Sequence, residues 1–525
     1  MTRRQNGLCI LALGLSAVIT TQPAKAQPRF QRIAWTNSGP LYPAWNHEYQ
    51  VAYSGLGIDG SGESGIWRGQ KGYGLELVAG VESSAPGTGT GNYFGNFRPP
   101  LLNSNGETAF VASLSGPFID PTNDSGIWSE GGGNGLGLVA REGNVAPGTG
   151  ANFGPFSVSS RLSLNSAGQT AFLATLTGPE IDPTNDSGIW SDGSGNGIEL
   201  IARKGYLAPG TTANFDRLVV DTGIALNGKG QTAFSFTLNG PGVNSTNDSG
   251  IWSEGNGNGL ELVAREGNVA PGTSAHFDRF VIGGPPMLND LGDMVFVADL
   301  AGPNVESNNN RGIWSNAGEN DLHLVVRKGD AVPGIANSVF DNFSIPQINS
   351  DGQIVFAGTL SGLDIDNSNQ ESIWRVDASG VLHLIAQSGD NAPGTNAIFS
   401  RTYGPGLNNM GKVGFAGQLV GEGVNGTNDF GLWAEDRIGK LQLIVREGDT
   451  IDVSDDPDAP DFRQIELIAI NGALNDVGEA FFFARFRDGS EGVFVASLAA
   501  VPEPNNMLLI CTLLVSVYFA RRTNK

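Results

Sequence analysis

The chain has 525 residues, a formal net charge of −22 and 76 glycines, and 39% of its residues are hydrophobic. This composition supports a packed core rather than global disorder, and the acidity disfavours nucleic acid and anionic membrane surfaces as partners. The only two cysteines, Cys9 and Cys511, lie near the chain ends. The body between them therefore has no disulfide and no thiolate for catalysis or metal binding.

Residues 1–26 are predicted to be a secretory signal that is removed on export. Arg3 and Arg4 supply a basic start, "LCILALGLSAVITT" the apolar run, and "AKA" before Gln27 a small-residue cleavage site. An N-terminal anchor helix is the alternative, but an apolar run of about 14 residues is short for a membrane span. Export without disulfides is typical of a bacterial surface rather than a eukaryotic secretory route.

One phrase, NxxGxxAF, recurs along the chain and defines a repeat of about 60 residues. It is clearest as "NSNGETAF", "NSAGQTAF" and "NGKGQTAF", and it is worn in the first copy, "NHEYQVAY". Asn and Gly at these positions are typical of a tight turn with positive φ. The eight copies begin at Asn46, Asn103, Asn165, Asn227, Asn289, Asn349, Asn408 and Asn475.

Each repeat contains four strand-like pieces separated by Gly, Asn, Asp and Pro clusters. The first follows the Asn-Gly turn, the second holds a tryptophan as in "SGIWSEG", the third resembles "LELVAREG", and the fourth begins with phenylalanine as in "FDRFVIGG". Four short strands per repeat are typical of a propeller blade. The sequence therefore predicts an all-β fold, a β-propeller with eight blades of about 60 residues. Seven blades or a β-solenoid are the alternatives.

The two ends of the repeat domain, residues 27–500, indicate how the ring closes. Fourth strands begin at eight phenylalanines, starting with Phe30, whereas the last repeat stops after its first strand and a second strand around Phe494. Residues 27–45 are therefore predicted to pair as a fourth strand beside residues 475–498, completing an eighth unit that lacks only its third strand. The Phe, Ile and Trp positions should fill the space between neighbouring sheets.

Arginines recur at the end of the third strand, and two interpretations are open. Each side chain could hold a loop carbonyl or a carboxylate, or the set could form a ring of ligand-binding arginines. Gln387 and Gly80 replace the arginine in two repeats, which weakens the second interpretation. The set consists of Arg141, Arg203, Arg265, Arg327 and Arg446.

The C-terminal tail, residues 501–525, carries three features in a fixed order. Pro502, Glu503 and Pro504 precede an apolar segment at 507–520, and Arg521 and Arg522 follow it. The apolar segment is short of the roughly 20 residues that cross a bilayer squarely. The arginines should stay on the cytoplasmic side. A transient membrane insertion is predicted, with a permanent C-terminal anchor as the alternative.

Both the repeats and the tail resemble known bacterial families. The NxxGxxAF units resemble the tandem-repeat proteins that bear this phrase, and the tail resembles a PEP-CTERM sorting signal. The second resemblance implies processing by an exosortase, transient insertion in the inner membrane of a Gram-negative-type bacterium, and delivery to the cell surface or the extracellular matrix. It also implies association with biofilm and extracellular polysaccharide. Neither resemblance implies a biochemical activity.

No catalytic constellation is evident in the sequence, and no catalytic residue is assigned. The best candidate site is the loop before each tryptophan, where oxygen-bearing side chains stand at fixed offsets, as in "DPTNDSG". Calcium, which prefers oxygen ligands, is the one cofactor that this pattern suggests. Side chains that cap their own backbone are the alternative. The candidate ligands are Asp59, Glu63, Asp120, Asp124, Asp182, Asp186, Asp248, Asp366 and Asp429.

The sequence thus favours a non-catalytic surface or matrix protein whose loops meet polysaccharide or other exported proteins. An exported carbohydrate-active enzyme or a lectin on the same scaffold is the alternative, because a fold alone does not decide function. A lectin should repeat aromatic residues in exposed loops, and an enzyme should break the repeat with extra polar residues. The repeated aromatics here stand in strand-like contexts instead.

Overall fold

A computed structural model describes most of the repeat domain. The described residues are 29–36, 44–46, 50–56, 63–70, 74–133, 135–157, 160–219, 223–280, 286–319, 321–454, 456, 458–469 and 474–497. They lie within one compact unit, Pro28–Leu498. The predicted signal at 1–26 and the predicted tail at 501–525 fall outside the described residues. Within the described part, no helix is long and apolar enough to cross a membrane.

In the described part of the chain, thirty-nine strands form eight antiparallel sheets. The first sheet consists of β2 (Ala44–Trp45), β3 (Gln50–Leu56), β4 (Ser64–Gln70) and β5 (Gly74–Gly80), and the second of β6 (Tyr93–Phe97), β7 (Leu101–Leu102), β8 (Thr108–Ser115), β9 (Ser125–Ser129) and β10 (Gly137–Arg141). The third sheet consists of β11 (Val145–Ala146), β12 (Ala151–Phe153), β13 (Ser163–Leu164), β14 (Thr170–Thr177), β15 (Ser187–Ser191) and β16 (Glu199–Arg203). The fourth sheet consists of β17 (Asn214–Leu218), β18 (Ala225–Leu226), β19 (Thr232–Asn239), β20 (Ser249–Ser253) and β21 (Glu261–Arg265).

The remaining sheets continue the pattern. The fifth sheet consists of β22 (His276–Phe280), β23 (Met287–Leu288), β24 (Met294–Ala301), β25 (Arg311–Ser315) and β26 (His323–Arg327), and the sixth of β27 (Ser338–Phe343), β28 (Gln347–Ile348), β29 (Ile354–Gly362), β30 (Glu371–Val376) and β31 (Leu382–Gln387). The seventh sheet consists of β32 (Ile398–Leu407), β33 (Val413–Val420), β34 (Phe430–Glu435) and β35 (Leu441–Arg446). The eighth sheet consists of β36 (Thr450–Asp452), β37 (Phe462–Ala469), β38 (Glu479–Phe486), β39 (Glu491–Ser497) and β1 (Arg29–Thr36).

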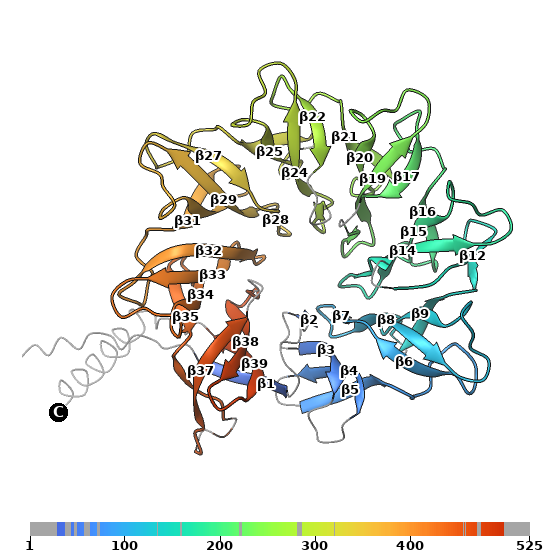
Figure 1. The fold of residues 1–525 in the computed structure, drawn as a ribbon, viewed down its shortest axis with the longest axis horizontal. Helices are drawn as coiled ribbons and strands as arrows, with labels where there is room; N and C mark the ends of the chain where they lie inside the picture. The colour runs from blue at the N-terminus through green and yellow to red at the C-terminus, as the bar shows by residue number, and fades with distance from the viewer. Residues whose placement is uncertain are drawn as a thin grey trace, which may run out of the picture. The chain divides into compact units, whose positions relative to one another are not determined.

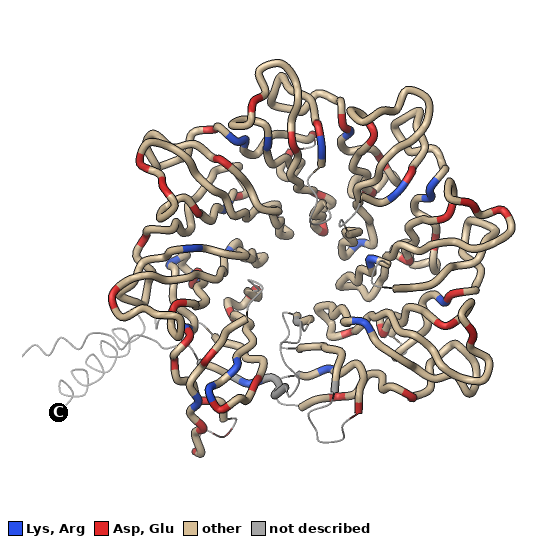
Figure 2. The backbone as a smooth tube through the Cα atoms, viewed as in Figure 1, with Lys and Arg blue, Asp and Glu red and all other residues tan. Residues whose placement is uncertain are grey.

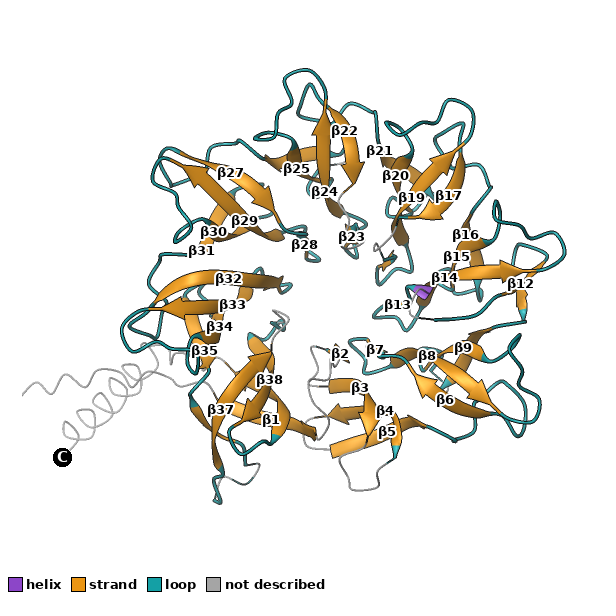
Figure 3. Ribbon diagram, in the orientation of Figure 1, coloured by secondary structure: helices purple, strands orange, loops and turns teal. Residues whose placement is uncertain are grey.

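The eight sheets follow one another around a ring, which confirms the predicted eight-bladed propeller (Figure 1). Each sheet takes its fourth strand, counted in the order of the sequence repeat, from the end of the preceding repeat, so blades and repeats are offset by one strand. In most blades a bulge splits that strand into a longer outer piece and a two-residue piece, such as β17 and β18, whereas β32 in the seventh blade is continuous. The two-residue pieces lie nearest the centre of the ring (Figure 3).

Ring closure is confirmed, but the identity of the closing strand was predicted wrongly. β1 pairs antiparallel with β39, from Arg29 opposite Ser497 to Thr36 opposite Glu491. It therefore occupies the third-strand position, and the fourth-strand position of this blade is held by β37. The prediction assigned "RFQRIAWT" to the fourth-strand position from Phe30 alone. Third and fourth strands both alternate apolar and polar residues, so a single aromatic residue does not distinguish them.

The core lies between neighbouring sheets rather than within one layer. Ile189 and Ala202 of the third blade pack with Phe215, Phe234 and Trp252 of the fourth. Because each sheet is covered on both faces, the middle strands are buried at almost every position, whereas an antiparallel sheet with one wet face would alternate. Each such aromatic side chain contributes about 3–5 kcal/mol to folding when truncation to alanine is the reference.

The repeated tryptophan is held by three recurring contacts. Trp252 donates from Nε1 to the carbonyl of Pro209 at 3.0 Å, and its ring meets that of Phe215 at 4.9 Å, tilted by 71°. A Cβ on Gly250 would lie 2.7 Å from the Trp252 ring, so only glycine fits there. The same bond to a proline carbonyl is made by Trp128, Trp190, Trp314 and Trp433 to Pro86, Pro147, Pro271 and Pro393.

The recurring arginines hold loop carbonyls, which confirms the structural interpretation. Arg265 donates from Nε to the carbonyl of Asn247 at 3.1 Å, across the base of the loop before Trp252. Gln387, which replaces arginine in one blade, donates to the equivalent carbonyl of Asn369 at 2.6 Å. The other members are Arg141, Arg203, Arg327 and Arg446, bonded to Asn123, Asn185, Asn309 and Asn428.

Candidate functional site

The asparagines that begin the first seven copies of the repeat phrase each link one blade to the next. Asn227 donates from Nδ2 to the main-chain carbonyl of Asn289 at 2.9 Å, although the two residues are 62 positions apart. The side chain is buried, at 3% exposed. Seven such links, at 2.7–3.0 Å, run from Asn46 to Asn103, Asn165, Asn227, Asn289, Asn349, Asn408 and Asn475.

The same side chain also closes its own turn. The Oδ1 atom of Asn227 accepts hydrogen bonds from the main-chain N–H groups of Lys229 and Gln231 at 3.1 and 2.9 Å. The turn needs glycine at its fourth position, because Gly230 has φ +81° and a Cβ there would lie 2.1 Å from the carbonyl oxygen of Gly193. The repeated NxxG phrase therefore encodes a turn and a link between blades at once.

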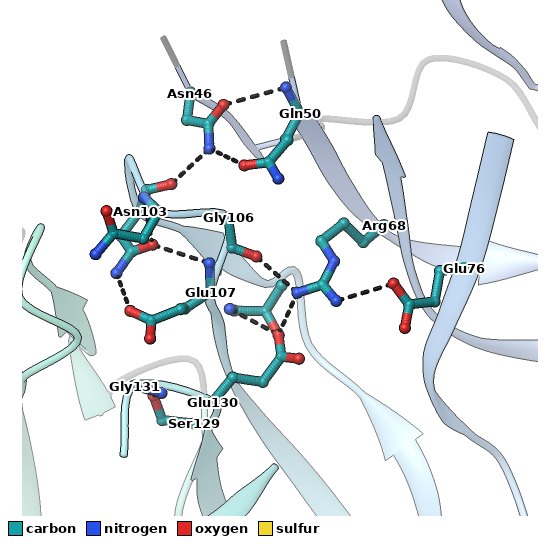
Figure 4. A network of polar contacts seen from close by, with 12 residues as sticks. Asn46, Gln50, Arg68, Glu76, Asn103, Gly106, Glu107, Ser129, Glu130 and Gly131 are labelled. Carbon is teal, nitrogen blue, oxygen red and sulfur yellow. Dashed lines mark hydrogen bonds and ion pairs between the residues drawn. The ribbon is translucent and has the colours of Figure 1, made fainter. Parts of the chain in front are cut away.

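Arg68 provides a second link between the first two blades, beside the asparagine chain (Figure 4). Its Nη1 donates to the carbonyl of Gly106 at 2.7 Å and to Glu130 at 2.8 Å, while Nη2 meets Glu76 at 2.9 Å. Arg375 makes the equivalent contacts with Gly411 and Glu435 in later blades. These polar groups are engaged in assembling the ring.

The loops before the tryptophans form rigid turns built on their Asp and Asn side chains. In the second blade Asp120 Oδ1 accepts from the N–H of Thr122 at 2.9 Å and from its hydroxyl at 2.6 Å. Asn123 Oδ1 accepts from the N–H of Asp120 at 3.1 Å. The hydroxyl bond from Thr122 lowers the pKa of Asp120 below its ordinary value. The alternative interpretation, side chains that cap their own backbone, is thus observed.

Four further blades repeat this turn with the same atoms. Asp182, Asn244, Asp366 and Asn425 take the place of Asp120, and each accepts from the residue two positions later. The pKa values of Asp182 and Asp366 are lowered by the hydroxyls of Thr184 and Ser368. All these turns are exposed, and Figure 2 shows acidic residues in loops around the ring.

The second carboxylate of each loop has other partners. Asp186 pairs with Lys204 at 3.3 Å, and Asp429 accepts from Gln418 at 3.0 Å. Among the described residues, no group of three or more His, Cys, Asp and Glu side chains is placed to hold a metal ion. Asp59 lies outside the described residues, and Glu63 is exposed. The calcium site therefore stays a prediction.

Sequence reasoning missed the partners of Asp124 and Asp248. Glu266 accepts from the N–H of Asp248 at 3.1 Å and from the Ser249 hydroxyl at 3.0 Å, and burial beside the Asp248 carboxyl raises its pKa to about 7. Burial likewise raises the pKa of Glu142, which lies beside Asp124. The glutamate in "REG" could have revealed these partners from the sequence. It repeats in only some blades, because lysine or serine replaces it elsewhere.

The predicted sorting residues Pro502, Glu503, Pro504, Arg521 and Arg522 lie outside the described residues. Their role stays a prediction.

Comparison with solved structures finds propeller proteins of several kinds. The polysaccharide lyase Uly1 is 10% identical, with 86% of this chain and 98% of that chain covered and a TM-score of 0.34. The Trypanosoma rangeli sialidase is 8% identical, with 84% and 61% covered and a TM-score of 0.24. The Pseudomonas aeruginosa periplasmic gluconolactonase PpgL is 15% identical, with 71% and 91% covered and a TM-score of 0.27. Values this low assign no activity to this chain.

Comparison at the level of sequence points to one family. No curated protein matches the chain. One family model matches twice, over residues 11–267 and 193–508, and so spans the whole repeat domain. The chain belongs to the family of unknown function DUF7453.

Proposed function

We propose that this protein is an exported, non-catalytic propeller of the bacterial cell surface or extracellular matrix. The observation that supports it best is the repeated loop before the tryptophan, which has the same hydrogen-bonded turn in five blades. Rigid loops lose little conformational entropy on binding, and several identical loops on one ring gain affinity by avidity. A matrix polymer with repeating units is the partner that such an array fits.

The ends of the chain supply the route to this location. The signal at 1–26 would start export, and the PEP-CTERM-like tail would hold the protein in the inner membrane until an exosortase-type enzyme cuts near Pro502–Pro504. The released acidic body then joins the matrix. Intact-mass analysis of surface protein from the native host tests this route. Mature protein should lack both segments, whereas material that still ends at Lys525 would contradict processing.

A polysaccharide screen tests the proposed role itself. The purified protein should bind matrix polysaccharide and release no reducing ends or unsaturated sugars from it. Asn244→Ala combined with Asp182→Ala should weaken binding, because two neighbouring loops lose the side chain that fixes their turn. Lys229→Ala, at the other end of the sheets, is the matched control. Turnover of any polysaccharide would reject the non-catalytic role.

A further inference from the structure

One cavity at the inner side of the ring is not explained by the assembly of the blades. Its volume is about 380 Å³, and most of its wall comes from the interrupted fourth strands of three consecutive blades. Arg98 and Leu101 come from the second blade, Arg161 and Ser163 from the third, and Ile224 from the fourth. Strands β7 and β13, which follow two of these interruptions, lie near the centre of the ring in Figure 3.

The charge of this cavity is opposite to that of the protein. Two arginines line it, and among the described residues its wall contains no Asp or Glu, although the chain carries −22 overall. Arg98 is exposed, and within the described part of the chain its guanidinium makes no hydrogen bond or ion pair. The recurring arginines of the third strands differ, because they bond to loop carbonyls. A guanidinium that bonds to no other group of the protein is available to bind a ligand.

The backbone at Arg161 is strained. Its φ is +47°, in the left-handed region that non-glycine residues seldom adopt. Such a conformation is energetically unfavourable and persists only where the surroundings impose it, often at binding sites. No glycine has replaced it here, although the chain uses 76 glycines elsewhere.

The rest of the wall is partly apolar and partly hydroxylated. Val111 and Ile224 are buried, and Pro99, Leu101 and Leu162 add apolar surface. The Ser163 hydroxyl donates to the carbonyl of Ile224, which ties the third blade to the fourth and leaves the oxygen free to accept. The cavity therefore offers an anion the unengaged guanidinium of Arg98 and the positive charge of Arg161, together with an apolar floor and hydroxyl groups.

We infer that this cavity binds a carboxylate-bearing sugar, such as a uronate unit of an acidic polysaccharide. The guanidinium groups of Arg98 and Arg161 receive the carboxylate, and the apolar wall faces the sugar ring. The site is distinct from the repeated loops before the tryptophans. It goes beyond the proposed function, because it names a ligand class and one single position on the ring where the eightfold pattern is broken.

Titration calorimetry with glucuronate tests this inference, with glucose as the neutral sugar and sulfate as the simple anion. Wild-type protein should bind glucuronate and not glucose. Arg98→Gln should weaken binding about tenfold or more, because one charge-assisted hydrogen bond is lost. Arg217→Gln, an exposed arginine on β17 outside the cavity, should bind as wild type does.

A second variant separates binding from folding. Arg161→Gly removes the guanidinium and relieves the positive φ, so the variant should melt no lower than wild type and still lose binding. Absence of saturable binding by wild type, or unchanged binding in both cavity variants, would overturn the site. Sulfate bound as tightly as glucuronate would overturn the sugar assignment. Binding to the repeated loops alone would leave Arg98→Gln unaffected, so failure here is distinguishable from failure of the proposed function.

Discussion

The two ends of each blade use the same residue types for opposite purposes. At one end of β19, Asn227 in the NxxG turn is buried and bonded to the next blade, 62 residues away. At the other end, the side chain of Asn244 accepts from its near neighbour Thr246 and is exposed. The buried end assembles the ring, and the exposed end carries the loops that we propose to bind a partner. The NxxG phrase is therefore a signature of assembly.

The largest expected effect comes from opening the ring. Deletion of residues 28–36 removes β1, exposes the edge of β39 and removes the contact between Phe30 and Phe482, whose ring centres are 6.0 Å apart. Phe30 is partly buried, so its loss costs less than the about 3–5 kcal/mol of a fully buried phenylalanine, and the lost strand pairing adds to this cost. Thermal unfolding should therefore begin at a much lower temperature. Removal of the tail after residue 501 is the control, and equal melting of both truncated proteins would reject closure by β1.

A smaller effect compares the two ends of one strand directly. Asn227→Ala leaves the Asn289 carbonyl and two turn N–H groups without a side-chain partner in a buried place, which should cost about 2–4 kcal/mol. Asn244→Ala exposes similar groups to water and should cost under about 1 kcal/mol. Urea unfolding of both variants measures the difference. Equal losses would show that the link between blades contributes nothing beyond its turn.

The sequence predicted the architecture better than the chemistry. Seven NxxG turns after a degenerate first copy, the buried tryptophans and closure by the N-terminal segment all follow from periodicity, because each repeat must bury both faces of its sheet. The link from Asn227 to Asn289 could not be predicted, since a turn residue has no pattern that reveals a partner in the next repeat. The cavity of Arg98 and Arg161 was also missed, because its residues lie in bulges of unequal length where the repeats do not align.

A pH experiment tests the protonation of Glu266, which lies beside the loop at the exposed end of its blade. Burial raises the pKa of Glu266 to about 7 in the folded protein, above its ordinary value of 4.5. The stability that its protonated form provides is full below pH 4.5 and is lost as the pH rises through 7. Glu266→Gln should therefore become more stable than wild type, by on the order of 1 kcal/mol, between pH 5 and pH 8.

The control for that experiment is Glu180→Gln, a substitution in the exposed loop of the third blade. Its stability should follow that of wild type across the same pH range. A constant difference between Glu266→Gln and wild type would contradict a buried protonated glutamate and would assign an ionised carboxylate to this position at neutral pH.

The smallest expected effect decides between turn and calcium in the exposed loops. One oxygen of Asp120 already accepts two hydrogen bonds, so a cation would have to use the other oxygen together with Asp124. Calcium at a concentration equal to its dissociation constant adds only about 0.4 kcal/mol per site. Several loops together should therefore raise the melting temperature by about 1–3 °C in millimolar calcium, relative to chelator. Magnesium, which demands stricter octahedral geometry, should raise the melting temperature less.

The triple variant Asp124→Ala, Asp186→Ala and Asp248→Ala should lose most of the rise in melting temperature. If wild type melts at the same temperature in calcium and in chelator, the repeated aspartates only hold the backbone of their own loops. The side chains at the exposed end of the blade would then have the same kind of role as Asn227 at the buried end, which is to bond main-chain groups.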